Sequence, residues 1–348
     1  MKQILIFLLV ILIEYAYSQQ SQHNGINWIS IEEAQELVKK QPKKILIDFY
    51  TNWCGPCKMM YANTFKDPNI INYINNYYYA VKFNAEGKDS AVFQGKTYYN
   101  PNYDSTRANS RNSTHELTKK LAPVNGRIAY PTIVYLDENL NILSAVPGYM
   151  KARQLQPILI YFAENIHKVA PYNRFSADFE KAFYDTAYIL QPRKINWYSF
   201  DQIPELIKKN PKKILVELVS PWSLTSKMVT DVTMEDSLVV DYINENFYPV
   251  KFDGLSQDSI LFNNEYYVNK NGQHPFHDLA VKLLNGQMYF PSTVFINSDY
   301  QIITAVNGYM APENLAPILK YFAEDKYKTI KWQDFINSFN KNKQENGN

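Results

Sequence analysis

The stretch Asp48–Met60 reads DFYTNWCGPCKMM, and it contains Cys54 and Cys57, the two cysteines of the 348-residue chain. Further along, Glu217–Val229 reads ELVSPWSLTSKMV, which repeats the apolar strand, the tryptophan and the Lys-Met pair of the first stretch. Serines occupy both cysteine positions in this second stretch. The chain therefore contains one motif twice and keeps its sulfur atoms in the first copy only.

The repeat extends well beyond this motif. Ile26–Tyr50 matches Ile195–Val219 at an offset of 169, with 13 of 25 positions identical. Val146–Glu164 matches Val306–Glu324 at an offset of 160, with 12 of 19 identical. Agreement at this level indicates a tandem duplication. The nine residues missing from the second copy belong to the polar loop Asn100–Thr114, which we expect at the surface.

Each copy alternates apolar strands with amphipathic helices and ends in a hairpin of strands. This order predicts an α/β fold in which helices flank a central mixed sheet. In the first copy we expect helices over residues 31–40, 53–64, 115–121 and 155–164, strands over 45–50, 77–83, 133–136 and 142–145, and a small hairpin over 91–99.

The length of the chain favours two domains over one. We expect the first copy at residues 26–169 and the second at 195–327, joined by a linker at 170–194 that carries a short helix. A C-terminal helix and tail should follow at 328–348.

The N-terminus has the pattern of a secretory signal. Lys2 is basic, Ile4–Ile13 is an unbroken apolar run, and Ala16–Ser18 offers small residues for cleavage. The run is shorter than the roughly 20 residues that span a bilayer, although an uncleaved membrane anchor remains the alternative. We therefore expect a signal peptide at residues 1–18 and an exported protein, periplasmic or secreted. The net charge of +2 does not favour nucleic acid as a partner.

The residues around the cysteines resemble those of the thioredoxin family, in particular the exported thioredoxin-like domains of bacteria. Trp53 precedes the pair, Gly55 and Pro56 separate the two cysteines, and Tyr130-Pro131 precedes a later strand. The resemblance implies two tandem thioredoxin-like folds, the second without its cysteines, and a cis peptide bond at Pro131. It also implies that substrates bind at Trp53, Gly55, Pro56, Tyr130 and Pro131.

The cysteine spacing suits dithiol chemistry. A helix that begins at Cys54 offers unpaired N–H groups and a partial positive charge, which favour thiolate over thiol. Such sites lower a cysteine pKa from about 8.5 to roughly 3.5–7.5. We therefore expect Cys54 to be the exposed nucleophile and Cys57, three residues on, to be the more buried resolving thiol.

Asp48 is a carboxylic acid within an apolar strand, so burial should raise its pKa. The resemblance implies that Asp48 lies beneath the cysteines and exchanges protons with the resolving thiol, with Lys82 as its neighbour. The alternative is a buried acid with a purely structural role. Glu217 keeps an acid at the same place in the copy without thiols, which favours that alternative.

Zinc is the competing interpretation of the Cys-x-x-Cys spacing. A structural zinc site needs four nitrogen or sulfur ligands, and no second cysteine pair exists. His115 and His277 occupy like positions at the start of a helix, where we expect surface or capping roles. We therefore expect no metal site.

These features predict an exported thiol-disulfide oxidoreductase that acts on protein disulfides through Cys54 and Cys57, in the reductase or isomerase direction. No bound cofactor is needed, and a membrane or soluble thiol should supply electrons. The alternative is a redox-inert binding or chaperone-like adaptor built on the duplicated scaffold.

Overall fold

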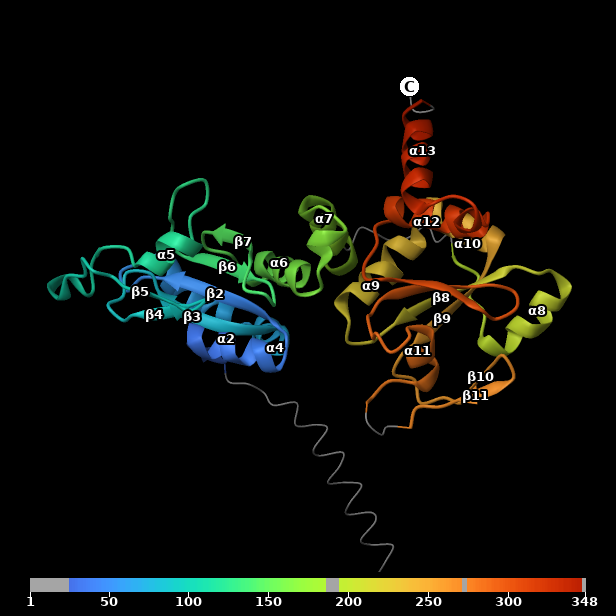
Figure 1. Cartoon of the computed structure of the whole chain (residues 1–348), viewed down its shortest axis with the longest axis horizontal. Helices are drawn as coiled ribbons and strands as arrows, with labels where there is room; N and C mark the ends of the chain where they lie inside the picture. The colour runs from blue at the N-terminus through green and yellow to red at the C-terminus, as the bar shows by residue number, and fades with distance from the viewer. Residues whose placement is uncertain (1–24, 186–193, 271–273, 346–348) are drawn as a thin grey trace, which may run out of the picture. The chain divides into compact units, whose positions relative to one another are not determined.

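A computed structural model describes residues 25–185, 194–270 and 274–345 of the chain. The expected signal peptide at residues 1–18 lies outside these ranges. The chain divides into two compact units, Met1–Ala163 and Glu164–Asn348, and each is built around one sheet (Figure 1). The fold predicted from the alternation of strands and helices is confirmed.

The first unit contains a five-stranded mixed sheet. The first three strands in the order below run parallel to one another, the fourth runs antiparallel to the third, and the fifth runs antiparallel to the fourth. The order is β1-β3-β2-β6-β7, with bounds Trp28–Ile29, Tyr78–Asn84, Lys44–Tyr50, Thr132–Leu136 and Ile142–Pro147. Every residue of β6 and nearly every residue of β2 is buried, which explains their uninterrupted apolar sequences.

Helices cover both faces of this sheet. The helices are α2 (Ile31–Lys40), α3 (Gly55–Ala62), α4 (Pro68–Tyr77), α5 (Glu116–Leu121) and α6 (Ala152–Ala163). On one face, α2 and α5 pack on the sheet with a hairpin of β4 (Ala91–Phe93) and β5 (Lys96–Tyr98). On the other face α4 contacts α6, and the Tyr135 ring of β6 stacks on Phe162 of α6.

The second unit repeats this plan with a four-stranded sheet, β13-β12-β8-β9. The strands span Ile302–Asn307, Ser292–Ile296, Lys213–Val219 and Phe247–Asp253, and a hairpin is formed by β10 (Ile260–Phe262) and β11 (Glu265–Tyr267). The repeated helices are α8 (Ile203–Lys209), α9 (Leu224–Asp231), α10 (Ser237–Asn246), α11 (Asp278–Leu283) and α12 (Pro312–Ala323). An isolated bridge from Tyr198 to Val250 stands where the first unit has β1.

Two further helices belong to the second unit. The helix expected in the linker is α7, which spans Tyr172–Phe183 and contacts α9 (Figure 1). The helix expected after the second copy is α13, which spans Trp332–Glu345. The Phe335 ring of α13 lies 5.1 Å from the Tyr321 ring of α12, so α13 packs on its own unit.

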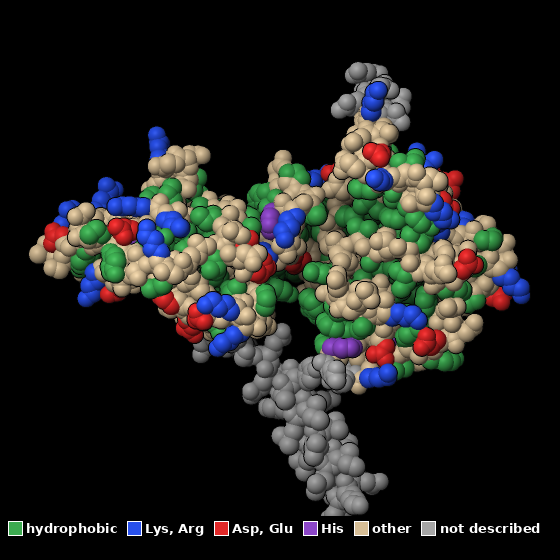
Figure 2. Space-filling model, in the orientation of Figure 1, with side chains coloured by type: hydrophobic (Ala, Val, Ile, Leu, Met, Phe, Trp, Pro, Cys, Tyr) green, Lys and Arg blue, Asp and Glu red, His purple; other side chains and the backbone are tan. Residues whose placement is uncertain are grey.

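On the face in view, Figure 2 shows cationic and anionic side chains interspersed over both units, in keeping with the small net charge. Within the described residues, no helix is both long and apolar enough to cross a bilayer.

Candidate active site

The two cysteines lie at the start of α3. Cys54 is the N-cap residue, and its Sγ accepts a hydrogen bond of 3.1 Å from the backbone N–H of Cys57. Gly55 and Pro56 form the first turn of α3. Backbone N–H groups in the first turn have no acceptor within the helix, so a proline, which has no N–H, costs no hydrogen bond there. The two sulfur atoms are joined in a disulfide. This local geometry places Cys54 against the positive end of the helix dipole.

The prediction that Cys54 is exposed is wrong for this disulfide form. Cys54 is 2% exposed and Cys57 is 6% exposed, so both side chains are buried. The physical reason is the N-cap geometry, which turns the Sγ of Cys54 inward onto the backbone of its own helix. Gly55 and Pro56 remain exposed, so the first turn of α3 is the accessible part of the motif.

Asp48 lies on β2, buried between its neighbours on β3 and β6. It pairs in register with Lys82 on β3 and with Ile133 on β6. Burial raises the pKa of this carboxyl to about 7, although the Lys82 charge acts to lower it. Its Oδ1 has no hydrogen-bond partner. Asp48 is therefore an acid that can change its protonation near neutral pH.

In the second unit the acid equivalent to Asp48 is Glu217, and its neighbours in the sheet differ. Burial raises the pKa of Glu217 to about 8, and the hydroxyl of Thr293 donates a 2.9 Å hydrogen bond to its Oε2. Thr293 stands opposite Glu217 in the sheet, at the place where Ile133 stands opposite Asp48. One oxygen of Glu217 thus has a hydrogen-bonding partner, whereas its Oε1, like Asp48 Oδ1, has none.

The Tyr130–Pro131 peptide bond is cis, as the sequence predicts. The Tyr130 ring contacts the Trp53 ring edge-to-face at 6.1 Å. The second unit keeps the same arrangement, with a cis Phe290–Pro291 bond and a Trp222–Phe290 contact at 5.8 Å. The aromatic pair therefore belongs to the shared scaffold and does not depend on the disulfide.

The sequence reasoning missed Glu86, which contacts Trp53 directly. The indole N–H of Trp53 donates a 2.7 Å hydrogen bond to Glu86, and the backbone N–H of Asn112 donates another at 2.8 Å to the same oxygen. The guanidinium of Arg111 lies 5.0 Å from the centre of the Trp53 ring. Glu86 therefore ties the polar loop that is unique to the first copy onto the tryptophan beside Cys54.

A signal for Glu86 was present in the sequence. The second copy has Leu255 at the equivalent position and also lacks nine residues of the loop. The acid and the long loop occur together in one copy and are both absent from the other. That joint difference was sufficient to suggest that they contact each other.

We predict that Glu86→Leu will loosen this loop. Two hydrogen bonds to a carboxylate are lost, so the Trp53 indole becomes more mobile and Arg107 and Arg111 become easier targets for trypsin. Limited proteolysis should show cleavage in the loop several-fold faster than in the parent protein. Glu33→Leu, an exposed acid on α2, is the matched control. Unchanged loop cleavage in Glu86→Leu would contradict this role for Glu86.

The two histidines cap helices, as expected. The Nδ1 atoms of His115 and His277 accept hydrogen bonds from the N–H groups of Leu117 at 3.0 Å and Leu279 at 3.1 Å. Both rings are fully buried. Among the residues that the structure describes, no group of three or more His, Cys, Asp or Glu side chains is placed to hold a metal ion.

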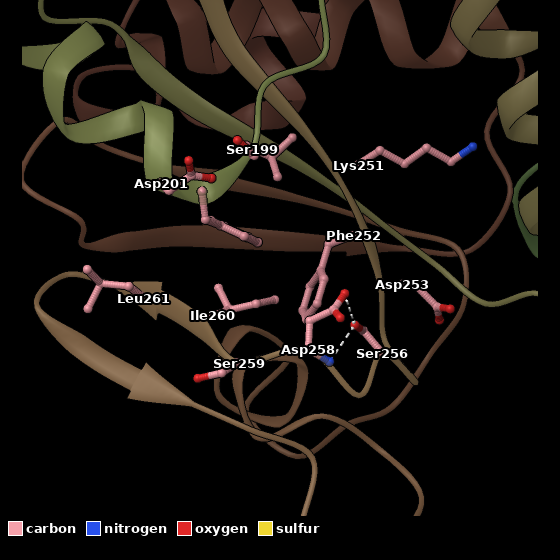
Figure 3. A pocket seen from close by; sticks show the side chains of 12 residues that line it. Ser199, Asp201, Lys251, Phe252, Asp253, Ser256, Asp258, Ser259, Ile260 and Leu261 are labelled. Atoms are coloured by element: carbon pink, nitrogen blue, oxygen red, sulfur yellow. Dashed lines mark hydrogen bonds between the residues drawn. The ribbon is translucent and has the colours of Figure 1, made fainter.

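The second unit contains a cavity. It has a volume of about 460 Å³ and is lined by residues such as Ser199, Lys251 and Asp258, the last of which is hydrogen-bonded to Ser256 (Figure 3). The first unit has a cavity of about 290 Å³ lined by the equivalent residues. Because both copies contain it, the cavity accompanies the fold and does not distinguish the unit with thiols.

The family model described as a thioredoxin-like domain matches residues 31–163 and 200–323, which is most of the chain. The chain belongs to the thioredoxin-like family. Both copies are matched, so the tandem arrangement expected from the repeat is confirmed.

Curated relatives match over shorter stretches. The thiol:disulfide interchange protein DsbD of Pectobacterium atrosepticum is 25% identical over 149 residues, covering 41% of this chain and 21% of that protein. DsbD of Vibrio vulnificus is 39% identical over 59 residues, covering 15% and 10%. The chain thus spans about a fifth or less of the DsbD proteins that it matches.

Solved structures with the same fold include a DsbH oxidoreductase, at 16% identity and a TM-score of 0.30, covering 42% of this chain and 88% of that one. A putative disulphide-isomerase from Bacteroides thetaiotaomicron has 24% identity and a TM-score of 0.29, covering 43% and 100%. The family and its cysteine pair support general thiol-disulfide redox activity.

The second unit retains the backbone of the lost site. Ser223 is the N-cap of α9 with φ −84° and ψ 115°, against −72° and 107° for Cys54, and its Oγ accepts a 3.1 Å hydrogen bond from Ser226 N–H. The surroundings differ, since Thr225 is buried and donates a hydrogen bond to Glu164. Its counterpart Pro56 is exposed.

We therefore predict that Ser223→Cys with Ser226→Cys will form a disulfide but restore little activity. The cap geometry brings the sulfur atoms together, while the buried first turn excludes a protein substrate. The test places both changes in a chain whose Cys54 and Cys57 are serines, then measures free thiols and insulin reduction. Insulin reduction near the parent rate would contradict the prediction.

Proposed function

We propose that this protein is an exported thiol-disulfide oxidoreductase that reduces or isomerises protein disulfides through Cys54 and Cys57. The observation that carries the proposal is the Cys54–Cys57 disulfide at the start of α3, in the unit where burial raises the pKa of Asp48 to about 7. An acid that titrates near neutrality suits proton exchange with a thiol.

The proposed reaction begins with the reduced protein. The thiolate of Cys54 attacks one sulfur of a substrate disulfide, and the other substrate sulfur leaves as a thiolate. Cys57 then gives its proton to Asp48 and attacks the Cys54 sulfur, so the second substrate sulfur leaves. The substrate gains two electrons, and the protein ends with the Cys54–Cys57 disulfide that the structure contains. A membrane or soluble thiol donor would reduce this disulfide again.

Substrate binding is assigned to the residues around the accessible first turn, namely Trp53, Gly55, Pro56, Tyr130 and Pro131. Gly55 and Pro56 are exposed, and the Trp53–Tyr130 aromatic pair offers an apolar surface next to them. In the second unit, the Ser223 hydroxyl lies 3.2 Å from the carbonyl oxygen of Phe290, the residue before the cis proline. The equivalent carbonyl of Tyr130 is therefore well placed to meet a substrate chain bound at Cys54.

Export is proposed from the N-terminal sequence, in which the apolar run Ile4–Ile13 precedes small residues at Ala16–Ser18. The test is expression in a bacterial host, followed by sequencing of the N-terminus of the protein in the periplasmic fraction. Cleavage close to Gln19 is the expected result. An intact N-terminus in the membrane fraction would contradict it.

The enzymatic proposal is tested by insulin reduction with dithiothreitol as the electron source. The parent protein should accelerate insulin precipitation, and Cys54→Ser should reduce the rate to that of dithiothreitol alone. Equal and negligible rates for both proteins would support the alternative, a redox-inert adaptor. The observation that favours this alternative is the duplicated scaffold, in which the second copy has no cysteine.

A further inference from the structure

In the second unit, α7 covers the helix that carries the lost site. Phe175 and Phe179 of α7 are buried, and the Phe175 ring lies 5.6 Å from the Tyr309 ring. The Tyr309 hydroxyl donates a hydrogen bond to the carboxylate of Asp178, which is also buried. One side of α9 is thus occupied by a helix of the same unit.

Residues of α9 and α12 complete this contact. Met228 on α9 is fully buried, and the Lys227 ammonium lies 5.6 Å from the centre of the Phe183 ring of α7. At the other end of the contact, Arg174 of α7 forms a 3.2 Å ion pair with Glu313. The contacts of α7 therefore involve a lysine, a tyrosine and one charged pair, and Met228 is buried next to that lysine.

The first unit carries the same residues without a helix of its own unit over them. Lys58, Met59 and Tyr149 are the counterparts of Lys227, Met228 and Tyr309. Met59 is 52% exposed, whereas Met228 is 0% exposed. Tyr149 is half-buried, whereas Tyr309 is buried. We call the surface formed by Lys58, Met59, Tyr149 and Arg153 the α3 face.

The chain also contains a second helix of the α7 type. At the repeat offset of 160, Phe335 and Phe339 of α13 are the counterparts of Phe175 and Phe179 of α7. Phe335 packs on its own unit, but Phe339 is only half-buried, whereas Phe179 is buried. Within one chain, α13 thus leaves apolar surface uncovered at the position that α7 uses for docking.

Both residues of the Arg174–Glu313 ion pair have counterparts of opposite charge in the proposed contact. The counterpart of Glu313 on the α3 face is Arg153, and the counterpart of Arg174 on α13 is Asp334. A reversed but still complementary pair is what a contact between α13 and the α3 face requires. Ser338 replaces Asp178 and can still accept a hydrogen bond from Tyr149. Lys343 replaces Phe183, so the contact with a lysine over a ring is absent.

We propose that α13 of one chain docks on the α3 face of a second copy of this chain, in the way that α7 docks on α9. Each chain has one such helix and one such face, so the contact is head-to-tail. Two chains can each dock their helix on the face of the other and form a closed dimer, or the contact can repeat from chain to chain and form a longer assembly. One helix on a small surface makes a weak contact, of the size class of transient complexes.

Docking at this place covers the start of α3. Thr225 is buried in the second unit, and its counterpart Pro56 is exposed in the first. We expect a helix on the α3 face to narrow access to the Cys54–Cys57 motif without closing it, because a cavity of about 340 Å³ lined by Ser223 and Ser226 persists in the second unit with α7 in place. In this respect the inference rests on the proposed function, because association should lower the rate of insulin reduction per chain as the protein concentration rises.

The test is sedimentation velocity of the chain after removal of the expected signal, at 1 to 200 µM. A chain that carries both Cys54→Ser and Cys57→Ser is used throughout, so that no thiol remains to form disulfide-linked species and the result does not depend on redox activity. We expect a concentration-dependent rise in mass, with Met59→Asp weakening association at least about tenfold because it places a charge in an apolar contact. Ile142→Asp, an exposed apolar position on β7, is the matched control and should associate normally.

Charge reversal identifies the partner helix. Arg153→Asp and Asp334→Arg should each weaken association about fivefold, and the double variant should recover most of the loss. A monomer at every concentration would overturn the proposal, and so would association that Met59→Asp leaves unchanged. Loss of insulin reduction in Cys54→Ser bears only on the proposed function, so the two claims fail separately.

Discussion

Replacing Cys57 by serine will convert the protein into a trap for its substrates. Cys54 at the N-cap of α3 can still attack a disulfide, but no thiol remains to release the mixed disulfide. We expect turnover of insulin to fall by about 10³-fold or more, in line with loss of a residue that acts in a covalent step. Non-reducing gels should show a covalent complex of one protein chain with one substrate chain.

The control is Cys54→Ser, which should lose turnover to the same extent without forming the complex. This pair of variants separates the two sulfur atoms by role, because both are buried in the disulfide form and burial alone does not distinguish them. A covalent complex that forms through Cys57 in the Cys54→Ser variant, and not through Cys54, would reverse the proposed assignment.

Asp48→Asn should change the pH dependence of stability more than any other single substitution in the first unit. Folded Asp48 holds its proton up to about pH 7, whereas the unfolded chain releases it near pH 3.8. Between these values the folded state binds more protons, so the free energy of unfolding falls as the pH rises. At 1.36 kcal/mol for each pKa unit, the loss across this window is about 4 kcal/mol.

Asparagine at this position cannot ionise, so this loss should disappear. Chemical denaturation of the reduced protein at pH 4, 5, 6, 7 and 8 measures it directly. Above pH 7 the Asn variant should be the more stable protein. Identical slopes of unfolding free energy against pH for Asp48→Asn and its parent would contradict the raised pKa of this buried carboxyl.

Glu217→Gln provides the comparison for catalysis. Its carboxyl is equally buried and its pKa is raised to about 8, so it should also contribute to the pH dependence of stability. The second unit has no thiol that could exchange a proton with Glu217, so Glu217→Gln should leave insulin reduction unchanged. Asp48→Asn should slow insulin reduction by about 10²-fold, the lower end for loss of a general acid or base.

The repeat accounts for how much could be predicted from the sequence. Two copies gave two patterns for most strands and helices, the paired motifs placed Cys54 at a helix start, and the resemblance to the thioredoxin family implied the cis bond at Pro131. The helix α4 was missed because its sequence, PNIINYINNY, is rich in asparagine, which is a weak helix former. Burial of Ile70 and Ile74 against the sheet side outweighs that preference.

Contacts between distant segments could not be predicted from local patterns. Glu86 and Trp53 are 33 residues apart, and the hydrogen bond between them depends on how the loop folds back. The placement of α7 on α9 joins Asp178 to Tyr309 across 131 residues. Such contacts are set by tertiary packing, which periodicity and capping signals do not encode.

The central claim is that the first turn of α3 holds Cys54 as a thiolate near neutral pH. Its most direct test is titration of this thiol in the reduced, folded Cys57→Ser protein, followed by thiolate absorbance at 240 nm or by the rate of alkylation with iodoacetamide. We predict a pKa below about 7.5, inside the range for cysteines at helix N-termini. A pKa at or above about 8.5, the value for a free cysteine, would contradict the account.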